Sequence, residues 1–356
     1  MWHNTGAYAG VLPFGNPVQP GTHFEEPETK RRIRNLLEVS GLIDSLHMIT
    51  PREATLEELL LVHTNEHVEA IKAAGEHMAI DGGLSAPMGT GSFEIALLSA
   101  GGVLAAVDAV LDGVVRNAYA LVRPPGHHAM PETAMGFCLF CNAAIAGRHA
   151  MSVRGLQRIA YVDWDVHHGN GTEAAFYNDP RALTISIHQD RNFPPWSGAL
   201  DDRGEAEGFG YNINVPLPPG SGVGAYDAVF DRVVIPALYA FQPELIIVPC
   251  GFDGGAYDPL GRMMLTSEAY RTMTGKIMKA ADELCSGRVV MTHEGGYSAP
   301  TAPFFGLAVM EQLSGHRTGV VDPFQEILGV LGQQELQPHQ EMLISEAEKL
   351  VADIHS

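Results

Sequence analysis

Five short apolar runs constrain the fold more than any other feature of this sequence. They occur at residues 117–122, 158–162, 183–187, 245–249 and 288–292. Helical patterns separate several of them, at about 139–153, 224–241 and 267–285. Strands that are apolar on both faces and alternate with helices are typical of a parallel sheet covered on both sides. We therefore predict an α/β fold, with a central parallel sheet and helices on both faces.

The rest of the chain adds helices and loops but no break between domains. Further helices are expected near 27–39, 55–63 and 65–74, in a long apolar helix ending near Leu111, and in a polar helix at 333–356. Loops are expected at 1–25 and 81–92. No repeat, low-complexity segment or linker divides the 356 residues, which are enough to bury a large core. We expect a single domain over residues 1–356.

The acidic balance of the chain argues against one broad class of function. Lys and Arg total 22 and Asp and Glu total 42, which gives a net charge of −20. A nucleic-acid-binding protein is expected to carry a basic surface, so we expect no nucleic-acid partner. An acidic surface could attract cationic substrates, although solubility is the simpler explanation for most of the charge.

Cysteine usage and the N-terminal sequence indicate a reducing, cytoplasmic setting. The chain has four cysteines, too few for a disulfide framework at this length: Cys138, Cys141, Cys250 and Cys285. The first two form a lone CxxC in an apolar run, which favours buried thiols over a zinc or redox pair. No signal peptide and no run of 18 apolar residues are found, so we expect no membrane association.

A polar cluster follows each of the five predicted strands. The clusters are Arg123-Pro-Pro-Gly-His-His128, Asp163-Trp-Asp-Val-His-His-Gly-Asn170, His188-Gln189, Gly251-Phe-Asp253 and His293-Glu-Gly-Gly-Tyr297. In open α/β sheets, ligands bind in the crevice beyond the carboxyl ends of the strands. We therefore expect the five clusters to form one functional site.

Asp165, His167 and Asp253 have the composition of a metal site. Residues two apart in an extended chain point the same way, so Asp165 and His167 could hold one ion, with Asp253 as a third ligand. Two carboxylates and an imidazole suit zinc or another divalent transition ion, and three protein ligands leave room for water and substrate. Alone, the Asp-x-His pair would be more simply a capped turn with a hydrogen-bonded histidine.

His127, His128 and Tyr297 are candidates for the chemistry. An imidazole can take a proton from water and return it to a leaving amine, and Asp163 and Asn170 are available to orient the two rings. Adjacent histidines could also be metal ligands or surface residues. The two glycines before Tyr297 permit a backbone that brings its phenol close to a ligand, where it could stabilise an oxyanion. A tyrosine that merely packs after a turn is equally compatible with the sequence.

Taken together, these motifs resemble the zinc-dependent histone deacetylase family. The clusters above, with Gly136-Phe-Cys and Asp258-Pro-Leu-Gly, occur in order and at matching separations over about residues 20–315. Asn170 and the Asp-Pro-Leu-Gly segment resemble the class II branch, and the bare catalytic domain resembles bacterial histone deacetylase-like amidohydrolases. The resemblance implies the arginase–deacetylase fold and a single deacetylase catalytic domain.

The resemblance also implies a role for each catalytic residue. Asp165, His167 and Asp253 would bind zinc. His128 would act as general base and then acid, with His127, oriented by Asp163, as its electrostatic partner. Asn170 stands where many class I members have a carboxylate, which implies a weaker base at His128. Tyr297 would complete the oxyanion site.

Substrate and potassium positions follow from the same resemblance. The substrate-binding residues would be Gly136, Phe137, Phe193 and Leu260; the two phenylalanines match the aromatic walls of an acyl-lysine tunnel, and Leu260 its aliphatic rim. Structural potassium would bind near the zinc through Asp163, Asp165 and Ser186. A second potassium would use backbone oxygens near Phe176 and Tyr211.

The implied activity is a zinc-dependent amidohydrolase that removes acetyl or other acyl groups from lysine-type amides. The alternative is an acetylpolyamine deacetylase. Polyamine-specific members have Glu where this chain has Leu260, although Glu25 or Asp81 could stand in as a rim carboxylate. Eukaryotic members commonly carry an Asp in the loop matching 81–92 that grips the substrate backbone; here only Asp81 stands at its start, which leaves recognition of a peptide backbone open.

Two other classes of function fit less well. A catalytically dead acyl-binding module would lack a ligand or Tyr297, and none is missing. An arginase-like two-manganese site would need more Asp ligands than the sequence supplies. Bacterial relatives are often oligomeric, so a homo-oligomer is an expectation by resemblance.

Overall fold

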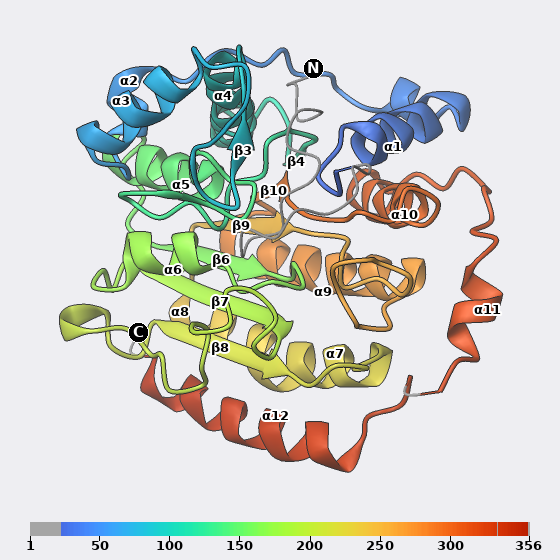
Figure 1. Ribbon diagram of the computed structural model, residues 1–356. Helices are drawn as coiled ribbons and strands as arrows, with labels where there is room; N and C mark the ends of the chain where they lie inside the picture. Colours follow the sequence, from blue (N-terminus) through green and yellow to red (C-terminus); the bar gives the residue numbers. More distant parts are fainter. Residues whose placement is uncertain (1–22, 333, 355–356) are drawn as a thin grey trace, which may run out of the picture.

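A six-stranded parallel sheet runs through the middle of the protein (Figure 1). The computed structural model describes residues 23–332 and 334–354, so most of the loop predicted at 1–25 lies outside the described residues. The strands are β4 (Asn117–Ala120), β6 (Ile159–Asp163), β7 (Ala182–Gln189), β8 (Asn212–Leu217), β9 (Leu245–Cys250) and β10 (Val289–His293). They lie in the order β4-β10-β9-β6-β7-β8, and every neighbouring pair is parallel. The predicted parallel sheet is confirmed, and β8 is an additional strand.

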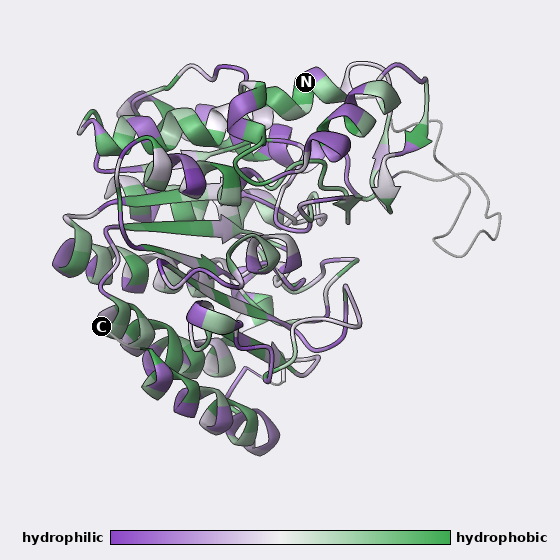
Figure 2. Cartoon of the chain, turned by 90° about the vertical axis from the view of Figure 1, so that its left-hand side faces the viewer, coloured by the Kyte–Doolittle hydropathy of each residue, from purple (hydrophilic) through white to green (hydrophobic). Residues whose placement is uncertain are grey.

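Helices cover both faces of the sheet, which explains why the strands are apolar on both sides. In β6, Ile159 and Tyr161 pack into one core cluster, while Ala160 and Val162 pack into the other. This alternation is the two-residue period of a strand. Figure 2 shows hydrophobic strands in the middle layer and mixed hydrophobic and hydrophilic colouring on the helices outside them.

Each core cluster is completed by its own group of helices. The cluster with Ile159 and Tyr161 includes side chains of α2 (Leu56–Leu59), α3 (Asn65–Ala74), α4 (Ser92–Leu111), α5 (Asn142–Ser152) and α6 (Asn170–Phe176). The cluster with Ala160 and Val162 includes side chains of α1 (Glu28–Val39), α7 (Val223–Val229), α8 (Ile235–Phe241), α9 (Ser267–Cys285), α10 (Ala302–Ser314) and α12 (Pro338–Leu350). The result is a three-layer α/β architecture.

Most predicted helices are present, with small shifts at their ends. The helices at 65–74 and 267–285 have the predicted bounds, and the predicted 224–241 segment is α7, the π-helical η4 (Phe230–Val234) and α8 in succession. Helix α2 ends earlier than expected, at Leu59, and begins with a capping box between Thr55 and Glu58. The polar helix predicted at 333–356 is the shorter α12. Helices α10 and α11 (Gln325–Gly329) were not predicted.

Helix α4 is long and apolar enough to cross a membrane by length and composition alone. A search for uninterrupted apolar runs does not find this helix, because Glu94 and Asp108 interrupt its apolar sequence. Its mean hydropathy nevertheless stays as high as that of a membrane helix. The helix is nevertheless part of the core: Ala100, Val103 and Val107 are fully buried in it. Its apolar composition is therefore explained by packing.

The loop predicted at 81–92 contains short strands whose pairing fixes its position in the fold. Strands β1 (Ile80–Asp81) and β3 (Pro87–Met88) pair with each other, and β2 (Gly83–Leu84) pairs with β5 (Ala134–Met135). Gly136 N and Phe137 N donate to the carbonyl oxygens of Leu84 and Ser85. The loop therefore supports the segment that carries Gly136 and Phe137.

Candidate active site

The sheet order brings the predicted polar clusters to one edge. Strands β10, β9 and β6 are neighbours, and parallel strands end at the same edge, so the segments after them lie together. Asp165, His167 and Asp253, predicted from different strand ends, form a buried group whose candidate ligand atoms all lie within 4.8 Å of one another.

The geometry of these three residues fits a divalent metal ion. His167 Nδ1 lies 3.0 Å from Asp165 Oδ1 and 3.2 Å from Asp253 Oδ2. The Asp253 Oδ2 atom is buried and has no hydrogen-bond partner. An unsatisfied buried carboxylate oxygen is costly unless a cation or donor meets it. Two carboxylates and one imidazole converging in this way match the donor set that zinc binds.

Backbone hydrogen bonds hold the two carboxylates in place. His167 N donates to Asp165 Oδ1 (2.9 Å), Gly295 N donates to Asp165 Oδ2 (2.8 Å), and Val166 N donates to Asp253 Oδ1 (2.9 Å). A Cβ at Gly295 would lie 2.0 Å from Asp253 Oδ2 and 2.7 Å from Asp165 Oδ2. Only glycine fits here, so the first glycine of the Gly-Gly pair leaves space for the two carboxylates of the candidate metal group.

The two histidines lie beside this group, each oriented by its predicted partner. His127 Nδ1 is 3.0 Å from Asp163 Oδ2, and the His127 and His128 ring centroids are 4.0 Å apart. His128 Nδ1 donates to Asn170 Oδ1 at 2.8 Å, because the Asn170 amide nitrogen already donates to the His128 carbonyl. This fixes the His128 tautomer, with the proton on Nδ1 and the lone pair on Nε2.

The surroundings give the two rings opposite charge preferences. Burial disfavours the charged form of His127, but the carboxylates of Asp165 and Asp163 raise its pKa to about 10. Burial lowers the pKa of His128 well below its ordinary value, and the positive charges of His127 and His167 lower it further. Two adjacent imidazoles are thus driven apart in pKa, as expected for paired acid–base groups.

Glu294 is a part of the site that no local sequence pattern predicts. Its Oε2 accepts hydrogen bonds from Gly126 N (2.7 Å) and His127 N (3.1 Å), so it holds the turn that presents the His pair. Burial raises the pKa of Glu294 to about 8. The only sequence signal is its place directly after β10, next to the strand that ends in this turn.

Two of the predicted tunnel residues pack against the proposed catalytic side chains. The Phe137 ring packs edge-on against Tyr297 (5.9 Å between centroids), and the Phe193 ring packs edge-on against His128 (4.9 Å). Gly136 lies close to both His128 and Phe193, because a Cβ there would lie 2.4 Å from His128 Cδ2 and 2.7 Å from Phe193 Cε1. Burial and the Asp253 and Asp165 charges raise the pKa of Tyr297, so its hydroxyl remains a proton donor.

Neither carboxylate suggested as a substitute for a rim Glu serves that purpose. Glu25 is only 2% exposed, and its side chain accepts hydrogen bonds from Lys30 and Arg123. Asp81 accepts hydrogen bonds from the backbone of Gly83, Ser85 and Ala86, so it shapes its own loop. Leu260 is half-buried, and its carbonyl accepts a hydrogen bond from Asn192, the residue before Phe193.

The residues named for potassium lie in two places. Asp163 and Ser186 are paired across β6 and β7, next to Asp165. Phe176 ends α6 and Tyr211 precedes β8, and their carbonyl oxygens accept hydrogen bonds from Asp179 N and Thr184 N. These carbonyls retain a second lone pair, which is compatible with cation binding.

The cysteines take no part in the metal group. All four are buried and free. Burial raises the pKa of Cys141 to about 12 and that of Cys138 well above its ordinary value, so both remain thiols. The expectation of buried thiols at the CxxC is confirmed.

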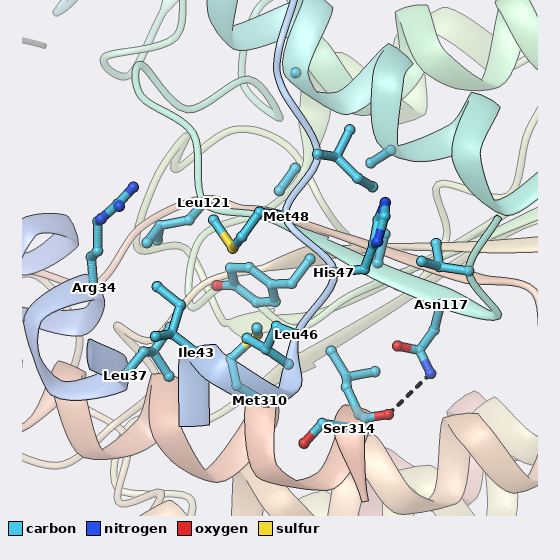
Figure 3. Close-up of a pocket in the computed structure, with 18 of the residues that line it drawn as sticks. Arg34, Leu37, Ile43, Leu46, His47, Met48, Asn117, Leu121, Met310 and Ser314 are labelled. Carbon is cyan, nitrogen blue, oxygen red and sulfur yellow. Dashed lines mark hydrogen bonds between the residues drawn. The ribbon is translucent and has the colours of Figure 1, made fainter. Parts of the chain in front are cut away.

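A separate pocket of about 540 Å³ lies along the edge strand β4 (Figure 3). It is lined mainly by apolar side chains from α1, α10 and the 43–51 segment, including Leu37, Leu46, Met48 and Met310. None of the predicted site residues lines it. Its position separates it from the chemistry at the carboxyl ends of the strands.

Comparisons with known proteins show the family to which the chain belongs. Residues 23–313 match the model of the histone deacetylase domain family. The chain is 49% identical over 331 residues to a histone deacetylase-like amidohydrolase from Pseudomonas aeruginosa, covering 92% of this chain and 87% of that protein. It is 39% identical to histone deacetylase 8 of Arabidopsis thaliana, covering 87% and 86%. The crystal structure of the HDA15 HD domain superposes with a TM-score of 0.80 at 36% identity, covering 94% of each chain.

Proposed function

The chain belongs to the histone deacetylase family and is a hydrolase that deacetylates amides, and from this premise we propose that it is a zinc-dependent enzyme that removes acyl groups from lysine side chains. The observation that carries the zinc assignment is the buried, unsatisfied Asp253 oxygen facing His167 and Asp165. Zinc bound there would polarise the acyl carbonyl and lower the pKa of a bound water.

His128 is the proposed general base. Its Nε2 carries the free lone pair, since Nδ1 donates to Asn170. The ring can therefore accept a proton from the attacking water and later deliver it to the leaving amine. His127, held by Asp163, lies against the same ring and stabilises negative charge developing nearby. Asn170 carries no charge, and we expect a weaker base than a carboxylate partner would produce.

Tyr297 is the proposed oxyanion donor. Its hydroxyl stays protonated, and its ring is packed against Phe137, one wall of the proposed tunnel. A donor aimed at the developing oxyanion stabilises the transition state more than the bound substrate. Potassium near Asp163 and Ser186, and at the Phe176 and Tyr211 carbonyls, is proposed as a structural component.

We favour a neutral acyl-lysine stem over a polyamine. The proposed channel is bounded by Phe137, Phe193 and Leu260, and desolvating the charged stem of a polyamine beside them is costly without a partner. Both candidate replacement carboxylates, Glu25 and Asp81, are engaged elsewhere. Only the net charge of −20 favours the polyamine, because an acidic surface could steer cations toward the site.

The test is a comparison of kcat/KM for acetyl-, trifluoroacetyl- and longer acyl-lysine peptides with that for acetylated putrescine and spermidine. We expect wild type to prefer an acyl-lysine peptide, and Leu260→Glu to shift the preference toward the polyamines. A tenfold preference of wild type for a polyamine would overturn the lysine assignment. An unchanged preference in Leu260→Glu would show that Leu260 is not at the rim.

The cytoplasmic location, the single-domain organisation and a homo-oligomeric state remain predictions. Size-exclusion chromatography with light scattering would test the last of these. A mass equal to one chain would contradict it.

A further inference from the structure

Asp258 connects the segment of Tyr297 with the rim of the proposed tunnel. It is 8% exposed, and both of its carboxylate oxygens accept backbone hydrogen bonds. Oδ2 accepts from Tyr297 N (2.7 Å) and Ser298 N (3.2 Å), and Oδ1 accepts from Leu260 N (2.9 Å). One side chain therefore fixes two loops that meet at the same site.

The loop that carries Tyr297 needs these hydrogen bonds to hold its backbone in place, because two glycines precede the tyrosine. Gly296 has φ +122°, a conformation that L side chains rarely adopt, and neither glycine has a side chain to pack. The loop is held at one end by Gly295 N donating to Asp165 and at the other end by Asp258. The position of the Tyr297 backbone is thus set between a metal-binding carboxylate and Asp258.

The rim is held from its other side by Asn192. The Asn192 Nδ2 atom donates to the Leu260 carbonyl at 2.9 Å, and Asn192 directly precedes the aromatic wall residue Phe193. The Leu260 backbone is therefore hydrogen-bonded at its N–H to Asp258 and at its carbonyl to Asn192. These bonds form a continuous connection from Tyr297 through Leu260 to the Phe193 loop.

We propose that Asp258 is a positioning residue that places the Tyr297 hydroxyl for the reaction, and that Asp258 and Asn192 together hold the Leu260 rim for substrate binding. The proposal rests on the function proposed above. It assigns two separable effects: loss of the Tyr297 bonds lowers kcat, whereas loss of the Leu260 bonds raises KM.

Three variants separate these effects. Asp258→Ala loses all the bonds, and because a misplacement of about 1 Å can cost ~10²-fold in rate, we expect kcat to fall about 100-fold. In Asp258→Asn the remaining oxygen best serves the two donors Tyr297 N and Ser298 N, which turns the amide NH₂ toward Leu260 N. We therefore expect Asp258→Asn to keep kcat within about threefold and to raise KM several-fold. Asn192→Ala should do the same.

Double-variant cycles distinguish positioning from a general structural role. If Asp258 acts through the Tyr297 hydroxyl, Asp258→Ala should cost less than about threefold in kcat when Tyr297 is already Phe. If Asp258 and Asn192 hold the same Leu260, the KM of Asp258→Asn with Asn192→Ala should be close to that of either single variant. Equal fold-losses in both backgrounds, or multiplying KM effects, would overturn the proposal.

Glu244 offers a matched control. Its carboxylate also accepts two backbone hydrogen bonds from another loop, those of Gln157 N and Arg158 N, but at the opposite edge of the sheet. Glu244→Ala should lower the midpoint of thermal unfolding and leave kcat and KM within about twofold. If Asp258→Ala does not fold, Asp258→Asn and Asn192→Ala still test the proposal that Asp258 and Asn192 hold the Leu260 rim. An unchanged KM in both variants would refute that part of the proposal.

The cycle can be run on whichever acylated amine wild type hydrolyses best. If wild type prefers a polyamine, the lysine assignment fails while the kcat cycle between Asp258 and Tyr297 remains decisive. If Asp258→Ala retains kcat within threefold on an active wild-type background with zinc bound, the positioning role fails independently of the substrate.

Discussion

Gly136→Ala should disable the proposed catalytic base without replacing any of the side chains proposed to bind the metal or transfer a proton. The added Cβ would lie 2.4 Å from His128 Cδ2, 2.9 Å from His128 Cγ and 2.7 Å from Phe193 Cε1. Carbon atoms in contact normally lie ~3.5–4.0 Å apart, so the His128 ring would have to move by about 1 Å. The ring is buried and bonded to Asn170, so this movement disturbs the base itself.

The expected loss is about 100-fold in kcat, since a misplacement of about 1 Å can cost ~10²-fold in rate. A backbone cost comes in addition. Gly136 has φ +53°, and holding an L-residue there costs roughly 1–2 kcal/mol of folding stability. The assay is steady-state hydrolysis of an acetyl-lysine peptide, with bound zinc and the free energy of unfolding in urea measured on the same sample.

Gly155→Ala is the matched control. Gly155 also has a positive φ, +78°, but a Cβ there would meet no atom within 4 Å. It should show the backbone cost in stability and no loss of kcat. If Gly136→Ala kept kcat within threefold while folded and zinc-loaded, His128 and Phe193 could not be the groups that contact the reacting substrate. An equal loss in Gly155→Ala would assign the effect to instability.

Three further predictions address the ion, the tyrosine and the pH dependence of stability. Chelation should abolish hydrolysis and added zinc should restore it, and full activity in verified metal-free protein would contradict the role of Asp165, His167 and Asp253. Tyr297→Phe should lower kcat by ~10²–10³, about 3–4 kcal/mol, with KM within threefold; a kcat within threefold of wild type would mean that the tyrosine only packs. Burial, with the charge of His67, lowers the pKa of His63 in the folded protein from 6.5 to about 3. As pH falls below 6.5, His63 is therefore protonated in the unfolded chain before it is protonated in the folded protein. The stability that neutral His63 contributes to the folded protein is lost over that range. Wild type should lose about 1.4 kcal/mol more than His63→Gln between pH 7.5 and 5.5 in urea unfolding, and a pH-independent gap would contradict this.

The residues at the strand ends could be predicted from the sequence because parallel strands impose their convergence. The proposed metal ligands are Asp165, His167 and Asp253, and 88 positions separate the first from the last. Each of them follows a buried apolar strand, and the sheet brings the ends of these strands together. Strand β8 escaped detection because Asn212, Asn214 and Pro216 interrupt its apolar residues. Those polar residues are tolerated because Asn212 and Asn214 both donate to the half-buried Glu173.

The residues that escaped prediction act on distant backbone atoms. Glu294 accepts from Gly126 and His127, more than 160 positions away, and no local pattern announces such a bond. Glu25 was wrongly considered for an exposed rim because its sequence surroundings do not reveal Arg123, which lies 98 positions further on and binds it. Side-chain bonds to remote backbone are set by the packed fold, whereas strand ends are visible in the sequence.

These remote bonds explain how loops so rich in glycine can form a rigid site. Gly126 and Gly295 have no side chains to pack, yet each N–H donates to a buried carboxylate, from Glu294 and Asp165 respectively. A side chain at either position would collide: a Cβ would lie 2.5 Å from Asn142 N at Gly126 and 2.0 Å from Asp253 Oδ2 at Gly295. The glycines let the backbone approach the carboxylates closely, and the carboxylates in turn fix the glycines. Acidic residues in this site therefore have two functions: some of their oxygens are available to a metal ion, and others replace the packing that the glycine loops lack.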